Sequence, residues 1–214
     1  HSQSDGGETY VIFGGASVGS SGTILASTLD GTNGIRFYGE DSSDNSGAAV
    51  SGAGDINGDG NTDLLIGIAG SDNDGRLGYS VSSAGDINGD GIADFVLGAP
   101  RADPSTVTDV GEAYFVFGGT SNLSSLDAAN GSTDGTISVS NLNGTTGFKV
   151  TGLFASDFLG GSVSHAGDVN GDGIDDVIIG TYKLEGSVRD GATGDQYVIF
   201  GSTSIGSSGS IDLS

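Results

Sequence analysis

Residues 86–94 read Asp86-Ile87-Asn88-Gly89-Asp90-Gly91-Ile92-Ala93-Asp94. Oxygen-bearing side chains stand at positions 1, 3, 5 and 9 of this stretch, and a glycine stands at position 6, where the chain must turn tightly. A hard cation such as Ca²⁺ takes about six to eight oxygen ligands, and a short acidic loop can wrap around it. Without a cation, the aspartates of so short a loop would repel one another. The stretch therefore predicts a Ca²⁺-binding loop.

The same pattern occurs twice more, from Asp55 to Asp63 and from Asp168 to Asp176. Positions 1, 5 and 9 are Asp and position 3 is Asn in all copies. Position 7 differs in chemistry between the copies, so we expect it to contribute its backbone carbonyl oxygen. About three bound Ca²⁺ ions are predicted. Their predicted ligands are Asp55, Asn57, Asp59, Asn61, Asp63, Asp86, Asn88, Asp90, Ile92, Asp94, Asp168, Asn170, Asp172, Ile174 and Asp176.

The loops are not those of an EF-hand. An EF-hand needs a glutamate at position 12 and a helix on either side, whereas position 12 here is Ile66, Leu97 or Ile179. Each loop is followed by a short apolar run rich in β-branched and aromatic residues, which is typical of a buried strand. We therefore expect position 9 to close the cation site from the start of a strand, and no helix beyond a single turn near Leu123–Ala129.

Further elements recur around the loops. A Tyr-led strand reads Tyr10-Val11-Ile12-Phe13-Gly14-Gly15 and returns from Tyr114 and from Tyr197, and an Ala-Gly pair precedes each loop. With Phe117-Gly118 and Gly98-Ala99-Pro100, the chain resembles the FG-GAP repeats of integrin α-subunit β-propellers and their bacterial relatives. The resemblance implies an all-β fold in which each repeat is about one four-stranded blade, with the acidic loop between its first two strands.

The spacing of these elements indicates a single propeller region, 1–214, with four parts. We expect 1–48 to form a partial blade, 49–78 a short repeat without its outer two strands, 79–160 a full blade and 161–214 a partial last blade. The sum is about three to three and a half integrin-like blades in an incomplete ring, whereas propellers usually close with about four to eight. Unpaired edges are expected at Tyr10–Phe13 and Tyr197–Phe200, and such edges invite pairing. Self-association or neighbouring repeats would then complete the propeller.

Composition restricts the partners and the setting of the chain. The formal net charge is −22 with six Lys and Arg residues, so no nucleic acid is expected, because such binding needs clustered basic residues. No run of about eighteen apolar residues occurs, so we expect no membrane insertion. Without Cys there are no disulfides or thiolate metal sites. Because extracellular Ca²⁺ modules bind weakly, at roughly 10⁻⁴–10⁻³ M, we predict an extracellular protein, secreted or at the cell surface.

The sequence shows no catalytic constellation, and we expect no enzyme. His165 is the only internal histidine, and the many Ser residues lie in low-complexity turns such as Ser20-Ser21-Gly22. Tyr38, Phe154, Phe158 and Tyr182 either line a ligand site or pack between blades. The resemblance implies a scaffold for adhesion or for binding a protein or glycan ligand, with structural Ca²⁺. Two alternatives stay open, namely a carbohydrate-binding, lectin-like propeller and the non-catalytic propeller part of a secreted enzyme.

Overall fold

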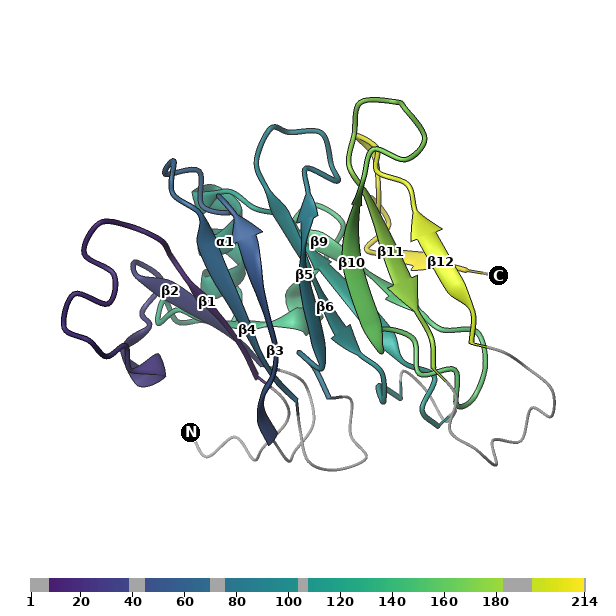
Figure 1. Cartoon of the computed structure of the whole chain (residues 1–214), viewed down its shortest axis with the longest axis horizontal. Coiled ribbons are helices and arrows are strands. Elements are labelled where there is room, and N and C mark those ends of the chain that lie inside the picture. Colours follow the sequence, from purple (N-terminus) through teal and green to yellow (C-terminus); the bar gives the residue numbers. More distant parts are fainter. Residues whose placement is uncertain (1–7, 39–44, 70–75, 104–107, 183–193, 214) are drawn as a thin grey trace.

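The computed structural model of the chain describes residues 8–38, 45–69, 76–103, 108–182 and 194–213. The described strands form three sheets that stand side by side across the molecule (Figure 1). Helical structure in these residues is limited to one α-helix and two 3-10 turns, η1 (Ala26–Thr28) and η2 (Val139–Asn141). The expected all-β fold with propeller-type blades is confirmed, and the described sheets do not close into a ring.

The first blade joins two parts of the chain that the repeat pattern separates. Its strands, from the inside outward, are β3 (Asn45–Gly54), β4 (Asp63–Ala69), β1 (Glu8–Ile12) and β2 (Gly34–Tyr38). β1 is antiparallel to β4 on one side and to β2 on the other, with Tyr10 opposite Ile66 and Arg36. The expectation that the short repeat lacks its outer strands, and that the strand at Tyr10 has an unpaired edge, is therefore wrong.

The second and third blades follow the same order. The second blade consists of β5 (Ser80–Gly85), β6 (Asp94–Ala99), β7 (Glu112–Val116) and β9 (Gly147–Thr151). The third consists of β10 (Ser162–Gly167), β11 (Asp176–Gly180) and β12 (Gln196–Ile199). The inner strands β3, β5 and β10 lie next to one another. Among the described strands β12 is the outermost of its sheet, as expected for the strand at Tyr197.

Neighbouring blades also exchange a short strand. β8 (Thr136–Ser138) belongs to the connection between β7 and β9 of the second blade, but it runs parallel to β2 of the first. β13 (Ser210–Asp212) follows β12 of the third blade, and it runs parallel to β9 of the second. Each blade thus adds a strand to the outer edge of the blade before it, which ties the two together through backbone hydrogen bonds.

The α-helix, α1 (Thr120–Ala128), lies between β7 and β8. Its nine residues make the expectation of a single turn wrong. Leu123 and Leu126 lie one turn apart on the same helix face, and both are buried. Ser, Thr and Asn are weak helix formers, so tertiary burial of this face stabilises the helix. In the part of the chain that the structure describes, no helix is long and apolar enough to cross a membrane.

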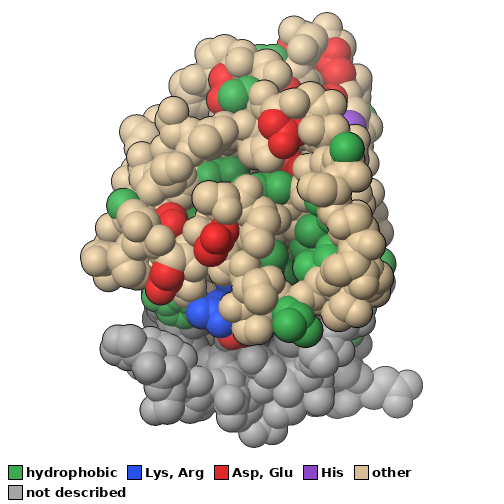
Figure 2. Space-filling model, turned by 90° about the vertical axis from the view of Figure 1, so that its left-hand side faces the viewer, with side chains coloured by type: hydrophobic (Ala, Val, Ile, Leu, Met, Phe, Trp, Pro, Cys, Tyr) green, Lys and Arg blue, Asp and Glu red, His purple; other side chains and the backbone are tan. Residues whose placement is uncertain are grey.

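The hydrophobic core lies between the blades. In the joint between the first and second blades, the rings of Phe37 and Phe95 meet edge to face with centroids 5.4 Å apart. In the joint between the second and third, Phe115 and Phe148 stack at 4.5 Å. Successive side chains of a strand point to opposite faces, so the second blade buries one face in each joint. Figure 2 shows the side of the first blade that points away from the second blade. It has hydrophobic side chains in a hollow with acidic side chains around them.

Candidate metal centre

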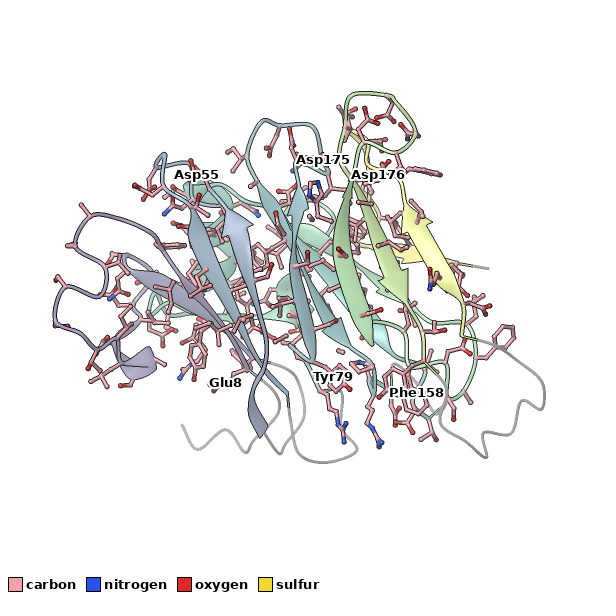
Figure 3. The ribbon with its side chains drawn as sticks, viewed as in Figure 1. Glu8, Asp55, Tyr79, Phe158, Asp175 and Asp176 are labelled. Atoms are coloured by element: carbon pink, nitrogen blue, oxygen red, sulfur yellow. The ribbon has the colours of Figure 1, made fainter. Side chains whose placement is uncertain are left out.

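The three acidic loops connect the first two strands of each blade, β3–β4, β5–β6 and β10–β11. Figure 3 places Asp55 and Asp176 at one end of the first and third blades, whereas Tyr79 and Phe158 lie at the opposite end. The structure therefore puts each set of predicted ligands in the same place on its own blade. It does not bring the three sets together into one shared site.

Each inner strand ends in a β-bulge that sets the direction of its loop. In the second blade the register of β5 against β6 shifts between Ser83 and Gly85. Gly85 has a φ of 64°, and the equivalent Gly54 and Gly167 have values of 78° and 70°. Glycine adopts this left-handed conformation without steric cost. The recurring Ala-Gly pair is therefore a bulge at the entrance to each loop.

In each loop, backbone N–H groups donate hydrogen bonds to the side chains at positions 1, 3 and 5, and these bonds hold the loop in a tight turn. In the second loop, Asp86 accepts the N–H of Asp90 on Oδ1 at 2.9 Å and the N–H of Gly91 on Oδ2 at 2.8 Å. Asn88 Oδ1 accepts the N–H of Asp90 at 2.8 Å, and Asp90 Oδ1 accepts the N–H of Ile92 at 2.9 Å. The first and third loops repeat these bonds. The side chains at positions 1, 3 and 5 therefore have one conformation in all three loops.

The aspartate at position 9 is buried and binds the backbone with both carboxylate oxygens. Asp94 Oδ2 accepts the N–H of Ile87 in the loop at 3.1 Å, and Oδ1 accepts the N–H of Gly118 after the third strand at 2.8 Å. Asp63 and Asp176 make the same bonds, to Ile56 and Gly14 and to Val169 and Gly201. This pair of bonds, here named the position-9 anchor, fastens the loop to the end of the third strand. The sequence pattern alone did not reveal it.

The glycine that takes part in the anchor has no room for a side chain. A Cβ on Gly118 would lie 2.2 Å from the carbonyl oxygen of Ala93 at position 8 of the loop. The equivalent distances at Gly14 and Gly201 are 2.2 and 2.3 Å. The end of the third strand comes this close because the buried aspartate binds its N–H. The glycine of the recurring Phe-Gly pair is therefore a steric requirement of the anchor.

Residues 77–116, which contain β5, the second acidic loop, β6 and β7, match the family model of the FG-GAP repeat. The chain contains an FG-GAP repeat. The expected resemblance is confirmed for these residues, and the loop, anchor and strand order of the matched repeat recur in the first and third blades. An FG-GAP repeat suggests an integrin-like propeller scaffold. No curated protein shows significant sequence similarity to the chain.

Each acidic loop carries aspartates at positions 1, 5 and 9. Burial raises the pKa of Asp94 to about 8; the hydrogen bond from Gly118 opposes this rise, and the carboxylates of Asp90 and Asp86 add to it. The pKa of Asp63 is also raised, first by burial and then by its acidic neighbours, against its backbone hydrogen bonds. A buried carboxylate beside other carboxylates favours a bound proton or a nearby cation. The first and second loops therefore have the electrostatics of a cation site.

The donor atoms of each acidic loop fit a hard cation. Each loop offers three carboxylates, one Asn side-chain oxygen and backbone carbonyls, with no sulfur or imidazole. In the described residues, which include all three loops, no three carboxylate, imidazole or thiol side chains form a ready metal cluster. At position 9 both oxygens already accept N–H groups, but a carboxylate oxygen has a second lone pair for a cation. Cation binding at these positions stays a prediction.

A side-chain bridge joins the second and third loops. Asp175, at position 8, accepts the N–H of Asp86 on Oδ2 at 2.9 Å and faces His165 Nε2 through Oδ1 at 3.1 Å. The N–H of His165 donates to Ser82 Oγ at 3.1 Å. Burial opposes ionisation of Asp175, but the contacts with Asp86 and His165 outweigh it and lower the pKa of this carboxyl. The internal histidine therefore helps to hold two blades together.

An aromatic and arginine cluster lies at the opposite end of these blades. Phe158 and Tyr182 stack with ring centres 4.8 Å apart, Tyr79 stacks on Tyr182 at 6.2 Å, and the Arg101 guanidinium lies 5.7 Å from the Phe158 ring centre. Phe158 is buried, whereas Phe154 is exposed. Phe158 and Tyr182 therefore pack between blades, which is one of the two roles left open for them. The described non-glycine residues with positive φ are Arg76, Asp109, Ser156 and Phe158.

A pocket of about 340 Å³ lies between the first loop and α1. The Thr120 hydroxyl at the start of α1 donates to the carbonyl oxygen of Asn57 in the loop at 2.7 Å. The pocket combines a polar part with an apolar part. Its lining consists of Phe13, Gly31, Thr32, Ile35, Asn57, Asp59, Thr120, Leu123, Ser124 and Asp127.

Proposed function

We propose that the chain is a Ca²⁺-binding, integrin-like propeller scaffold that works outside the cell, in adhesion or in binding a protein or glycan, without catalysis of its own. The observation that supports this most is that three loops carry the same donor set and the same position-9 anchor. The side chains at positions 1, 3 and 5 lie at the surface or are half-buried. Core packing therefore does not account for their repetition, whereas a shared ligand does.

Ca²⁺ fits the loops better than other common protein metals. Zn²⁺ sites are built mainly from Cys and His, and Mg²⁺ demands a near-ideal octahedron and keeps several waters. Ca²⁺ accepts a larger and more flexible shell of oxygens, such as one loop of carboxylate, amide and carbonyl oxygens supplies. The ion would offset the repulsion around the buried Asp94. Its role is structural, because it fixes the corner of a blade.

We infer both the extracellular setting and the absence of catalysis from the properties of the acidic loops. Loops of this kind that bind at roughly 10⁻⁴–10⁻³ M would be filled only where Ca²⁺ is abundant, outside the cell. With the loop ligands provided by the protein, few positions on the ion remain for a substrate. A rigid array of blades with loops at its ends offers a surface for a protein or glycan partner instead.

Calorimetric titration of the chelator-stripped chain with Ca²⁺ tests this proposal. We expect about three sites at millimolar Ca²⁺. Asp90→Ala should remove one site and leave the others. Asp195→Ala is the matched control, because Asp195 is an exposed acidic residue outside the loops, and it should leave the stoichiometry unchanged. Binding of no ion or one ion to the unsubstituted chain, or equal losses in both variants, would contradict the proposal.

The pocket beside the first loop favours a lectin-like site as a second candidate function. Small-ligand pockets combine apolar walls with a few polar groups that fix orientation, and this one places Asn57, Asp59 and Ser124 around Phe13 and Leu123. Glycan-array binding that Ser124→Trp abolishes, with the Ca²⁺ stoichiometry retained, would support it. Glycan binding that persists with this pocket filled would place the sugar elsewhere.

A further inference from the structure

The pocket between the first loop and α1 has a buried floor and an exposed rim. The buried residues of its lining include Phe13, Leu123 and Asp127, and the exposed ones include Asp59 and Ser124. Its volume of about 340 Å³ is near the lower end of the range of about 300–1,000 Å³ that is usual for ligand pockets. The pocket therefore suits a small ligand, such as one sugar ring.

Asp127 on the floor keeps one carboxylate oxygen for a ligand. The residue is only 7% exposed, and its Oδ1 accepts the N–H of Gly135 at 2.9 Å and the N–H of Thr136 at 3.1 Å. None of the described residues donates a hydrogen bond to Oδ2. Oδ2 lies beside Gly31, where a Cβ would be 3.3 Å from it. Both residues line the pocket, so the missing side chain at Gly31 leaves Oδ2 open to a ligand.

The negative charge of Asp127 has no cation beside it in the pocket. The residues that line the pocket, all of which the structure describes, include no Lys, Arg or His. Asp127 also lies in the last turn of α1, which holds no basic residue, and the C-terminal end of a helix carries partial negative charge.

The other carboxylate of the lining does not change this balance. Asp59 on the rim is a predicted ligand of the first loop, so a bound Ca²⁺ would use its charge. Asp127 would stay uncompensated, and a buried carboxylate without a partner for its charge is costly. A cationic group on Oδ2 would offset this cost.

We propose that the pocket binds a sugar that carries a free amino group, with the ammonium on Asp127 Oδ2. The inference rests on the lectin-like candidate function of this pocket and names the class of sugar. The hydroxyls of Thr120 and Ser124 on the exposed rim can bond to sugar hydroxyls. The apolar floor at Phe13 and Leu123 would cover the C–H groups of the ring.

A lysine side chain of a protein partner is the rival occupant. It also combines an ammonium with an apolar stem, so it could use Asp127 and the apolar floor. It carries no hydroxyl for the groups on the rim, which is why the lining favours the amino sugar.

A nuclear magnetic resonance titration of the chain with four small ligands tests the proposal. Glucosamine, glucose and N-acetylglucosamine share one ring, but only glucosamine carries an ammonium, and n-butylamine stands for a lysine side chain. Saturating Ca²⁺ keeps the first loop filled, and at about pH 6 the amine is protonated, as an α-amino group is. Glucosamine should bind about 10- to 100-fold more tightly than either neutral sugar, the factor that a hydrogen bond to a charged group supplies. It should also bind more tightly than n-butylamine.

Asp127→Asn tests the residue itself. The amide keeps an oxygen for the N–H groups of Gly135 and Thr136 and removes the charge, so glucosamine should bind no better than glucose, whose own affinity should not change. Asp134→Asn is the matched control. Asp134 Oδ1 accepts the same Thr136 N–H at 3.1 Å, but Asp134 is exposed and lies outside the pocket lining. This variant should keep the preference for glucosamine.

Three outcomes would overturn the proposal. Equal binding of glucosamine and glucose would remove the role of the ammonium, n-butylamine binding as tightly as glucosamine would point to a lysine side chain, and equal losses in both variants would show an effect of net charge alone. Circular dichroism checks that the variants fold, and if Asp127→Asn does not, the four ligands on the unsubstituted chain decide. Sugar binding that Ser124→Trp abolishes, but without a preference for glucosamine, would leave the lectin-like function standing, whereas binding of no sugar would remove both.

Discussion

Replacing Gly118 by Ala should destabilise the chain by breaking one position-9 anchor. The new Cβ would lie 2.2 Å from the carbonyl oxygen of Ala93 and 2.9 Å from atoms of Ile56 and Ile92. The end of β7 must therefore move, and the 2.8 Å hydrogen bond from Gly118 to Asp94 is lost. A buried acceptor without its donor costs about 1–3 kcal/mol, and overpacking costs about 1–3 kcal/mol. We expect the free energy of unfolding to fall by about 2–6 kcal/mol.

Urea unfolding followed by far-ultraviolet circular dichroism, in saturating Ca²⁺, measures this change. Gly52→Ala is the control, because Gly52 lies in β3 and a Cβ there meets no atom within 4 Å. The control should stay within about 0.5 kcal/mol of the unsubstituted chain. If Gly118→Ala also stays within that range, the close approach at the anchor does not constrain the fold and the steric account of the Phe-Gly pair is refuted.

Two further predictions concern the loops without cations. Chelation should lower the melting temperature, because at about 100 times the dissociation constant each independent site adds about 2.7 kcal/mol; a melting curve that EDTA leaves unchanged would rule out structural ions. In the chelated chain the free energy of unfolding should fall as the pH rises from about 4 to about 8. The pKa of Asp94 is raised from 3.8 when unfolded to about 8 when folded, so over this range the folded state keeps a proton that the unfolded state has lost. The slope should reach at most about 1.4 kcal/mol per pH unit for this group, and Ca²⁺ or Asp94→Asn should reduce it in urea titrations at several pH values.

The loops and the strands after them could be predicted from the sequence because their signals are local. Oxygen side chains at fixed spacing and a short apolar run need no knowledge of distant residues. The pairing of β1 with β4 is different, since Tyr10 lies opposite Ile66 only in the folded sheet, and chain order alone assigned β1 to a preceding blade. α1 was missed because its polar residues are weak helix formers, and only the burial of Leu123 and Leu126 against the blades reveals it.

In the candidate site, too, the local features could be predicted from the sequence, whereas the contacts between distant residues could not. The pattern identified position 9 as an aspartate at the start of a strand, and the structure has it there. The pattern did not indicate that Asp94 also reaches Gly118, 24 residues further along the chain. The Phe-Gly pair was visible as a repeated motif, but its cause is a carbonyl oxygen 2.2 Å from a Cβ that is absent. Such a contact exists only in three dimensions.

The residue at position 2 of the first and second loops connects the candidate cation site to the next blade. The N–H of Ile56 donates to Asp63 of its own blade at 3.0 Å, and its carbonyl oxygen accepts the N–H of Gly119 of the second blade at 2.7 Å. Ile87 likewise joins its own anchor to Ser202 of the third blade, at 3.0 Å from the Ser202 N–H to the Ile87 carbonyl oxygen.

An ion that holds the aspartates of a loop would therefore also hold the joint that follows it. In the third loop position 2 is Val169, whose side chain is exposed and whose N–H donates to Asp176 at 2.9 Å, as at the same position of the other loops. Removing the ions should therefore loosen the two described joints between blades as well as the loops themselves.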